Sequence, residues 1–194
     1  MSATSATLLE RLRDRSDAEA WQRLVELYTP LLSGWLRRHA LQAADVDDVV
    51  QEVLAVVARE APHFRHSGRT GAFRHWLRTI LANRLREFWR ARHTQPMASG
   101  DSNLAEMLDQ LEDPGSGISR LWDQEHDQHV ARRLLAMIEP QFTPSTWQAF
   151  RRVVLEGARP DAVAAELGLT INAVFIAKSR VLQRLRAEGR ELLD

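Results

Sequence analysis

The sequence predicts an all-α protein made of two small helical domains, a helical bundle and a helix-turn-helix domain, joined by an acidic linker. The chain has 194 residues but only nine glycines and one tyrosine, whereas an all-β fold needs many turns. Its seven prolines separate apolar runs that repeat with helical period. We expect the domains to cover residues 1–93 and 126–194, with the linker at residues 94–125.

The composition excludes several classes of protein. The chain has no cysteine, which rules out disulfides and thiolate metal sites. No stretch approaches the ~18 consecutive apolar residues of a membrane span. Residues 1–15 lack the apolar core of a signal peptide, so we expect a cytoplasmic protein without a membrane segment.

Charge is unevenly distributed along the chain, although 26 basic and 26 acidic residues cancel overall. Residues 94–125 carry one basic and seven acidic side chains, whereas residues 64–93 carry eight arginines and a single carboxylate, Glu87. Such asymmetry favours a nucleic-acid-binding face on the basic segment. The alternative is that these arginines only solvate a helix surface, and charge alone does not separate the two interpretations.

Three helices are expected in the first domain. The segment from Ser16 to Glu19 has the pattern of a capping box, so a helix should follow through Tyr28. The next helix should open at Asp45. It buries one apolar stripe, made of Val46, Val49, Val50, Val53, Leu54 and Val57. After a loop with two glycines, a third helix repeats this spacing between residues 73 and 89.

Arg84 falls within the apolar arc of the third helix. A buried guanidinium must be paired, so we expect a carboxylate partner, either from the helix at 45–52 or from Glu87. By their spacing, Trp76 and Trp89 are expected in the core.

Residues 94–119 lose the helical period and combine glycine, proline and serine with an acidic surplus, which is typical of a linker. At most one short helix is expected there, over residues 104–111. The helical pattern resumes from Ile118 to Ile138. Thr143 and Pro144 then mark another helix start, with proline at the first helical position.

Residues 160–186 have the spacing of a helix-turn-helix. Val163 and Leu167 should face inward on a short helix, Gly168 stands at the turn, and Thr170 can cap the second helix. In such a motif the second helix enters the DNA major groove. The phosphate contacts along it are expected from Lys178, Arg180, Arg184, Arg186 and Arg190. The alternative is an ordinary helical hairpin with a glycine turn.

Three segments, taken in order, resemble one family. They are Asp-Asp-Val-Val-Gln-Glu-Val at 47–53, Gly-Ala-Phe-Arg-His-Trp-Leu-Arg-Thr-Ile-Leu-Ala-Asn-Arg-Leu at 71–85, and the helix-turn-helix. Their order and spacing resemble an extracytoplasmic-function (ECF) sigma factor of the RNA polymerase sigma-70 superfamily, over nearly the whole chain. The resemblance implies that residues 1–93 are sigma region 2 and residues 126–194 are region 4.

The resemblance implies that the first segment docks on the clamp helices of the β′ subunit of core RNA polymerase. The residues it assigns to polymerase binding are Asp45, Asp47, Asp48, Gln51 and Glu52. They lie off the valine stripe and are free to meet a basic partner surface. Acidic side chains also stabilise a helix N-terminus, which accounts for the three aspartates but not for Gln51 and Glu52.

The resemblance also implies that the following loop and helix melt the minus-10 promoter element and read it as single-stranded DNA, with one base flipped into a pocket. The residues expected to contact this DNA are Arg65, His66, Ser67, Arg69, Thr70, Arg78, Asn83, Arg86 and Arg90. Asn83 matches the family's asparagine and can read a base edge as both donor and acceptor. The alternative for it is a surface asparagine without a role.

In region 4 the resemblance implies recognition of minus-35 DNA. The residues expected there are Thr170, Asn172, Ala173, Phe175, Lys178, Ser179, Arg180 and Arg184. Common family members carry a Lys-Ser-Arg triplet directly after the valine of the recognition helix. Here it comes three residues later, after Phe175-Ile176-Ala177. Phe175 is expected to contact a thymine methyl group or to pack against Trp147 or Phe150.

The sequence has no paired catalytic carboxylates, nucleophile elbow or phosphate loop, so we expect neither enzymatic activity nor a cofactor. His63, His66 and His75 lie among arginines, which repel a cation, and no metal site is expected. The expected partners are core RNA polymerase and promoter DNA, together with an anti-sigma factor or other regulator that no residue here identifies.

Two rival interpretations are a stand-alone helix-turn-helix transcriptional regulator that does not dock on polymerase, and a hydrolase or metal enzyme. Under the sigma-factor interpretation, the acidic linker should thread polymerase channels. Its negative charge should also disfavour DNA binding by the free protein.

Overall fold

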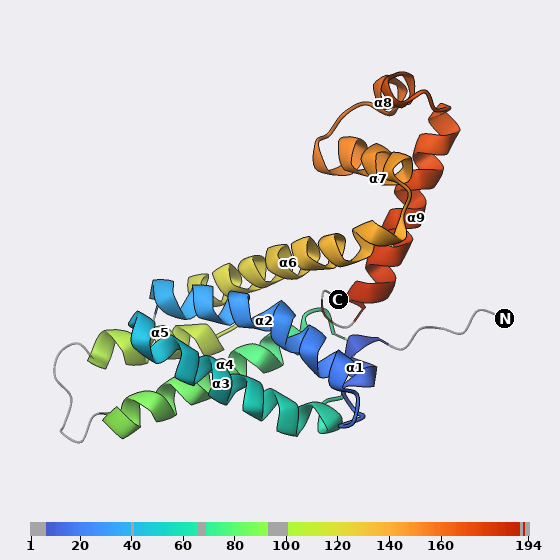
Figure 1. Cartoon of the computed structure of the whole chain (residues 1–194). Helices are drawn as coiled ribbons and strands as arrows, with labels where there is room; N and C mark the ends of the chain where they lie inside the picture. The colour runs from blue at the N-terminus through green and yellow to red at the C-terminus, as the bar shows by residue number, and fades with distance from the viewer. Residues whose placement is uncertain (1–6, 40, 66–68, 93–100, 191, 193–194) are drawn as a thin grey trace. The chain divides into compact units, whose positions relative to one another are not determined.

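In the part of the chain that it describes, the computed structural model consists of helices joined by turns and loops (Figure 1). It describes residues 7–39, 41–65, 69–92, 101–190 and 192, and for residues 39 and 101–104 the backbone alone. These residues form no strand, which confirms the all-α prediction. The chain divides into two compact units, residues 1–130 with 191–194, and residues 131–190.

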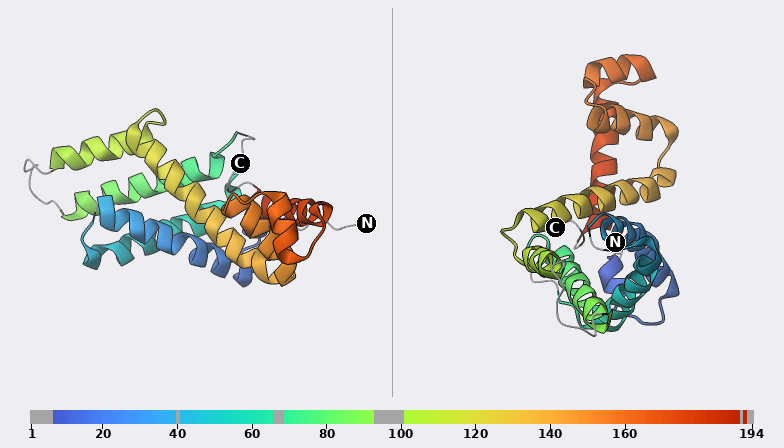
Figure 2. Two further views of the ribbon diagram at one scale, coloured as in Figure 1. Left: turned by 90° about the horizontal axis from the view of Figure 1, so that it is seen from above. Right: turned by 90° about the vertical axis from the view of Figure 1, so that its left-hand side faces the viewer.

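The first unit is a bundle of helices, seen nearly end-on in the right-hand view of Figure 2. In chain order its elements are α1 (Leu8–Arg11), α2 (Ala18–His39), α3 (Ala43–Glu60), η1 (Ala61–His63), α4 (Ala72–Arg92), α5 (Asp101–Glu112) and the first part of α6 (Gly117–Ile138). The start of α3 lies two residues before the expected Asp45.

The predicted stripes build the core of this unit. On α3 the valines at 46, 49, 50, 53 and 57 are all buried, and on α4 Phe73, Leu77, Leu81 and Leu85 are buried with them. Trp35 of α2 meets Trp122 of α6 edge to face, with ring centroids 5.6 Å apart. Since valine is a mediocre helix former, this packing is what stabilises α3.

The capping box expected at Ser16 is absent from the structure. The hydroxyl of Ser16 donates to Asp14, and Asp17 accepts the backbone N–H of Ala20 at 2.9 Å instead. Asp17 also binds the guanidinium of Arg11 at 2.7 Å. A charged carboxylate that is held by an arginine is a stronger acceptor than a neutral hydroxyl, so Asp17 takes the capping position.

The stretch expected as a linker, residues 94–125, is largely helical where the structure describes it. Helix α5 is longer than the expected 104–111, and α6 begins at Gly117. Leu108 and Leu111 of α5 and Trp122 of α6 are buried in the first unit. Pro114 and Gly115 stand between these helices and Gly117 is the first residue of α6, while the carboxylates of Asp109 and Glu112 face α4.

The second unit comprises the end of α6 followed by η2 (Glu139–Gln141), α7 (Pro144–Phe150), the π-helical η3 (Arg151–Leu155), α8 (Pro160–Leu167) and α9 (Ile171–Gly189). Thr143 caps α7 and Pro144 is its first residue, as predicted. Two buried clusters hold the unit together. One contains Ala149, Val163, Ala164, Val174 and Ala177, and the other contains Ile138, Phe150 and Val181.

Within the described ranges, no single helix has both the length and the apolar character needed to cross a membrane. Only α8 and α9, which are bent by 104° at their junction, reach these limits when they are counted together.

Candidate nucleic-acid interface

The α3 side chains expected to dock on polymerase fall into two groups. Asp47, Asp48, Gln51 and Glu52 are exposed, on the side of α3 away from the buried valines. Asp45 is buried, and its two carboxylate oxygens bind Arg92 of α4 at 2.5 and 2.7 Å. Asp45 therefore ties α3 to α4, while the other four side chains form an open polar surface.

A cavity of about 470 Å³ opens where the loop after η1 leads into α4. Arg65, Arg69 and Thr70 line it from the loop, and Gly71 forms its edge with a left-handed backbone, φ +77°. The expected DNA contacts His66 and Ser67 lie outside the described residues. The cavity thus combines positive charge with backbone that can approach a ligand closely.

Aromatic rings stand beside this cavity. Phe64, which lines it, lies 4.8 Å from Trp76 and 5.6 Å from Phe73, measured between ring centroids. Planar rings beside arginines are the combination that binds unstacked bases in single-stranded nucleic acid. Trp76 is partly buried here and contributes to the core as well.

Arg78 lies beneath α6 and not on an open surface. Its side chain is only 2% exposed, Nη1 lies 3.1 Å from Asp123 of α6, and Nη2 lies 2.9 Å from Nδ1 of His75. Burial lowers the pKa of Arg78, against the opposing effect of the Asp123 charge. The helical wheel did not show this position, because the helix expected at residues 118–138 was not expected to pack against α4.

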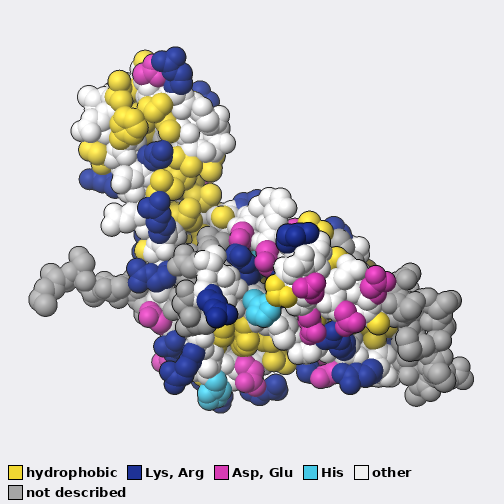
Figure 3. Space-filling view, turned by 180° about the vertical axis from the view of Figure 1, so that it is seen from behind, with side chains coloured by type: hydrophobic (Ala, Val, Ile, Leu, Met, Phe, Trp, Pro, Cys, Tyr) yellow, Lys and Arg dark blue, Asp and Glu magenta, His cyan; other side chains and the backbone are white. Residues whose placement is uncertain are grey.

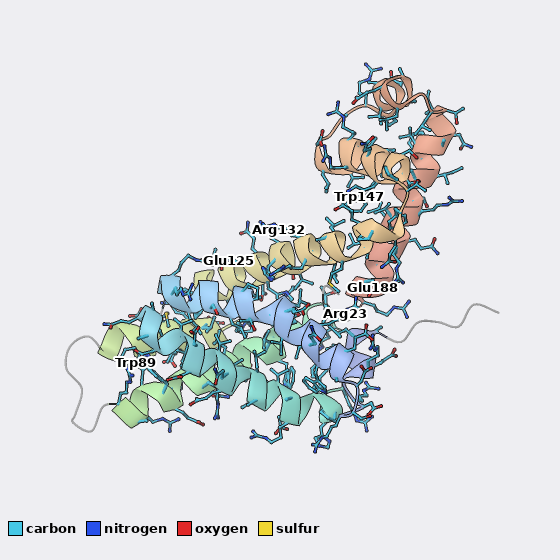
Figure 4. All side chains as sticks on the ribbon, in the orientation of Figure 1. Arg23, Trp89, Glu125, Arg132, Trp147 and Glu188 are labelled. Carbon is cyan, nitrogen blue, oxygen red and sulfur yellow. The ribbon has the colours of Figure 1, made fainter. Side chains whose placement is uncertain are left out.

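The other α4 residues singled out from the sequence differ in how far they are exposed to solvent. Asn83 and Arg90 are exposed, whereas Arg86 is partly buried against α5. Arg84 is also partly buried and binds Glu87 at 2.6 Å, which confirms Glu87 as its partner among the two expected sources. Trp89, labelled in Figure 4, is partly buried near the end of α4.

The second unit contains the predicted helix-turn-helix geometry. The axes of α8 and α9 differ by 104°, within the range of this motif. Gly168 forms the turn in the left-handed region, with φ +64°, and the hydroxyl of Thr170 accepts the backbone N–H of Ala173 at 3.1 Å. Both the turn glycine and the cap were predicted from the sequence.

Among the α9 residues expected to contact DNA, Asn172, Phe175, Ser179 and Arg180 are exposed, and Lys178 and Ala173 are partly exposed. Arg184 is held within the unit, because its Nε donates to Gln141 at 2.7 Å and the guanidinium also pairs with Glu188. The expected contact residues in the first three turns of α9 are therefore accessible, whereas Arg184 in the fourth turn is already bound by Gln141 and Glu188.

Phe175 does not pack against Trp147 or Phe150. It is 51% exposed, while Trp147 (labelled in Figure 4) packs against Phe142 and Phe150. Hydrophobic side chains also gather on the face of the second unit that Figure 3 presents. Ile171 and Ile176 of α9 are exposed as well, so this helix carries three exposed apolar side chains in its first two turns.

Sequence reasoning missed the acidic partners of α4. Arg74 binds Asp127 of α6 at 2.8 Å, and Arg86 binds both Asp109 and Glu112 of α5. The sequence signal that could have revealed these partners was the spacing of the acidic residues. Asp109 and Glu112 stand three residues apart, and Asp123 and Asp127 four apart, which puts each pair on one face of a helix.

In the part of the chain that the structure describes, no group of three or more His, Asp or Glu side chains is placed to hold a metal ion. The ionisable groups that line the cavity are four arginines, His75 and a single carboxylate, Asp123. A cavity with this surplus of positive charge can bind an anion or a polyanion.

The family comparison agrees with the geometry of the first unit. Residues 24–94 match the family model of sigma-70 region 2. This segment runs from within α2 to just beyond α4, so it contains the exposed α3 surface and most of the residues that line the cavity before α4. No curated protein matches the chain. Residues 24–94 are therefore similar to sigma-70 region 2, a domain of proteins that act with RNA polymerase in recognising and melting promoters.

Proposed function

We propose that the chain is an ECF sigma factor of the cytoplasm, which binds core RNA polymerase and directs it to specific promoters. The observation that carries this proposal is the region 2 match over residues 24–94 in a chain that also contains a helix-turn-helix. We further propose that region 2 extends over residues 1–93, that residues 94–125 connect it to region 4, and that region 4 covers residues 126–194.

The proposed polymerase contact is the exposed surface of α3. Its side chains at 47, 48, 51 and 52 are three carboxylates and one amide, and the β′ clamp helices would supply the basic counterpart. Asp45 contributes indirectly under this proposal, because its ion pair with Arg92 orients α3 relative to α4. Charge complementarity of this kind favours fast association and a fixed orientation.

The proposed minus-10 contact is the cavity before α4 together with the exposed part of that helix. Arg65, Arg69 and Thr70 would hold the backbone of a single strand, and the adjacent rings would support a flipped base. Asn83 and Arg90 would extend the contact along α4, and Arg86 would join them when it leaves its carboxylate partners. Arg78 supports the wall of this site from inside.

The proposed minus-35 contact is the open side of α9. Thr170, Asn172, Ala173 and Phe175 lie in its first turns, where a recognition helix contacts base edges. Lys178, Ser179 and Arg180 follow one turn later and would reach phosphates, with Arg184 after release from Gln141. The exposed ring of Phe175 is available to a thymine methyl group.

Retention on bacterial core RNA polymerase tests the docking proposal. We expect the purified chain to co-elute with core enzyme, and we expect retention to be lost in the triple variant Asp48→Ala, Gln51→Ala, Glu52→Ala. The matched control is Gln22→Ala, Glu26→Ala, Glu106→Ala, which also removes two carboxylates and one amide from exposed positions. The control should be retained like the wild type.

A stand-alone transcriptional regulator is the alternative, favoured only by the helix-turn-helix of the second unit. Wild-type protein that binds duplex DNA but is not retained by core polymerase would select that alternative. Equal retention of the two triple variants would instead remove α3 as the docking surface. In that case the polymerase contact would have to be sought elsewhere on region 2.

A further inference from the structure

Three arginines of α4 are held by carboxylates from α5 and α6 of the same chain. Arg86 Nη1 lies 2.5 Å from Glu112 and Nη2 lies 3.0 Å from Asp109. Arg74 Nη1 lies 2.8 Å from Asp127 of α6, and Arg78 Nη1 lies 3.1 Å from Asp123 of the same helix. All four acidic partners come from residues that follow the region 2 match, which ends at residue 94.

These contacts are not the local pairs that any charged helix makes with itself. The partners of Arg86 are 23 and 26 residues away in sequence, and those of Arg74 and Arg78 are 45 to 53 residues away. Hydrogen bonding to Glu112 raises the pKa of Arg86, so the guanidinium is firmly charged and held. Figure 3 shows acidic and basic side chains interspersed over the face of the first unit that it presents.

The position of α5 is fixed by apolar as well as ionic contacts. Leu108 and Leu111, on either side of Asp109 in sequence, are 3% and 0% exposed. They anchor the helix, so the carboxylates at 109 and 112 are presented to α4 in a defined place. A guanidinium binds two oxygens in a fork, and it makes the same bidentate contact with phosphate as with carboxylate.

We propose that α5 and the first turns of α6 act as a tethered mimic of DNA phosphates, which occupies Arg74 and Arg86 while the chain is free. This inference rests on the proposed function only in assigning nucleic acid as the ligand of α4. It goes beyond general repulsion by an acidic segment, because it names the arginines that are blocked and the carboxylates that block them.

The tether gives the mimic an advantage over DNA in solution. Only eight residues separate α4 from α5, and short connections give effective concentrations in the millimolar range. Single-stranded DNA at micromolar concentration therefore competes poorly for Arg86, although each exposed ion pair is individually weak. DNA that polymerase already holds next to α4 would not have this disadvantage.

Binding of a fluorescein-labelled, mixed-sequence single-stranded DNA 20-mer to the full chain tests the proposal, measured by fluorescence anisotropy without polymerase. We expect Asp109→Asn, Glu112→Gln to bind about two- to five-fold more tightly than wild type, as expected for opening a partly exposed ion pair. The slope of log affinity against log salt should steepen by about 0.7, because one more arginine meets a phosphate. Both positions are at the surface, and circular dichroism checks that the fold is kept.

The charge-matched control is Glu26→Gln, Glu106→Gln, which removes two carboxylates that do not contact α4 arginines in the described residues. Equal affinities of the control and the Asp109→Asn, Glu112→Gln variant would overturn the proposal in favour of a general charge effect. A second test uses Arg86→Ala. In that background the two substitutions should give no gain, and a gain that persists would also overturn the proposal.

The two proposals fail separately. Wild-type retention on core polymerase combined with no specific gain in the anisotropy assay leaves the sigma-factor assignment standing and removes the mimic. If the wild type is not retained on core polymerase but the Asp109→Asn, Glu112→Gln variant shows an Arg86-dependent gain in DNA affinity, the mimic stands and the sigma-factor assignment is removed.

Discussion

The hydroxyl of Tyr28 lies 3.2 Å from Nε2 of His126, and both side chains are buried where α2 meets α6. Nδ1 of His126 lies 3.0 Å from a carboxylate oxygen of Asp127. Burial, with the nearby charge of Asp127, raises the pKa of Tyr28 and keeps its hydroxyl protonated. The network is satisfied when Tyr28 donates to Nε2 and Nδ1–H donates to Asp127, so it fixes the position of α6 beside α2.

Replacement of Tyr28 by phenylalanine should weaken the first unit. The change removes the donor and leaves Nε2 of a buried histidine without that partner, which lowers the free energy of unfolding by about 1–2 kcal/mol. Urea denaturation followed by tryptophan fluorescence measures it. Val25→Ala, at an exposed position of the same helix, should change stability by less than about 0.5 kcal/mol. Equal midpoints for Tyr28→Phe and wild type would show that the hydroxyl contributes nothing.

Arg78 should act on the fold through its volume more than through its charge. Arg78→Met keeps a long apolar side chain, and the partly exposed Asp123 can turn to water, so we expect a loss of stability below about 1.5 kcal/mol. Arg78→Ala leaves a cavity beneath α6 and should lower stability by about 2–4 kcal/mol. Urea midpoints of the two variants provide the comparison. If methionine proves as damaging as alanine, the ion pair is the dominant contribution.

Gly168 should be required for the helix-turn-helix. Its φ of +64° is strained for any residue with a side chain, so Gly168→Ala should lower the stability of the second unit by about 1 kcal/mol. Gly117→Ala is the matched control, because a Cβ there meets nothing within 4 Å at the start of α6. Amide hydrogen exchange in α8 and α9 reads out the second unit alone. Equal exchange rates in the two variants would contradict the assigned role of the turn.

Acid stability should depend on Asp17. Hydrogen bonds from Arg11, and then from the backbone of Ala20, hold the pKa of Asp17 below its ordinary value. A carboxyl with a lowered pKa stabilises the fold above the ordinary value of about 3.9, and this contribution disappears as pH falls through the lowered value. Asp17→Asn should therefore be less stable than wild type at pH 5–7, with the difference shrinking below about pH 4.

Calorimetry at pH 7, 5 and 3 measures this convergence. Glu26→Gln, on the exposed side of α2, is the control and should run parallel to the wild type. A constant difference between Asp17→Asn and wild type across the whole pH range would assign the effect to the helix cap without a contribution from titration.

The helices could be predicted wherever one side of them is buried and the other is not. The valines of α3, the turn at Gly168 and the cap at Thr170 are local patterns, and each lies where the sequence placed it. The full length of helix α5 could not be predicted, because only Leu108 and Leu111 of its described side chains are buried. Its packing depends on contacts with α4, which no local pattern records.

The charge of the candidate site could be read from the sequence, but the pairing of its side chains could not. The surplus of arginine in residues 64–93 and of acid in residues 94–125 was visible from the sequence alone. That Arg86 faces Glu112, or that Arg78 lies under Asp123, depends on the fold of α5 and α6 against α4. A helical wheel treats each helix as isolated, so a neighbouring helix that covers its polar side is invisible to it.

The left-handed backbone at Gly71 limits how this region of the chain can vary over evolutionary time. A Cβ there would approach Nε of Arg74 to 2.6 Å, in addition to the strain of φ +77°. Any other residue would push Arg74 away from Asp127 and distort the edge of the cavity. The loop before it has no such restriction at Arg65, which is exposed. Drift can therefore change the loop at Arg65 while the position at the edge of the cavity stays glycine.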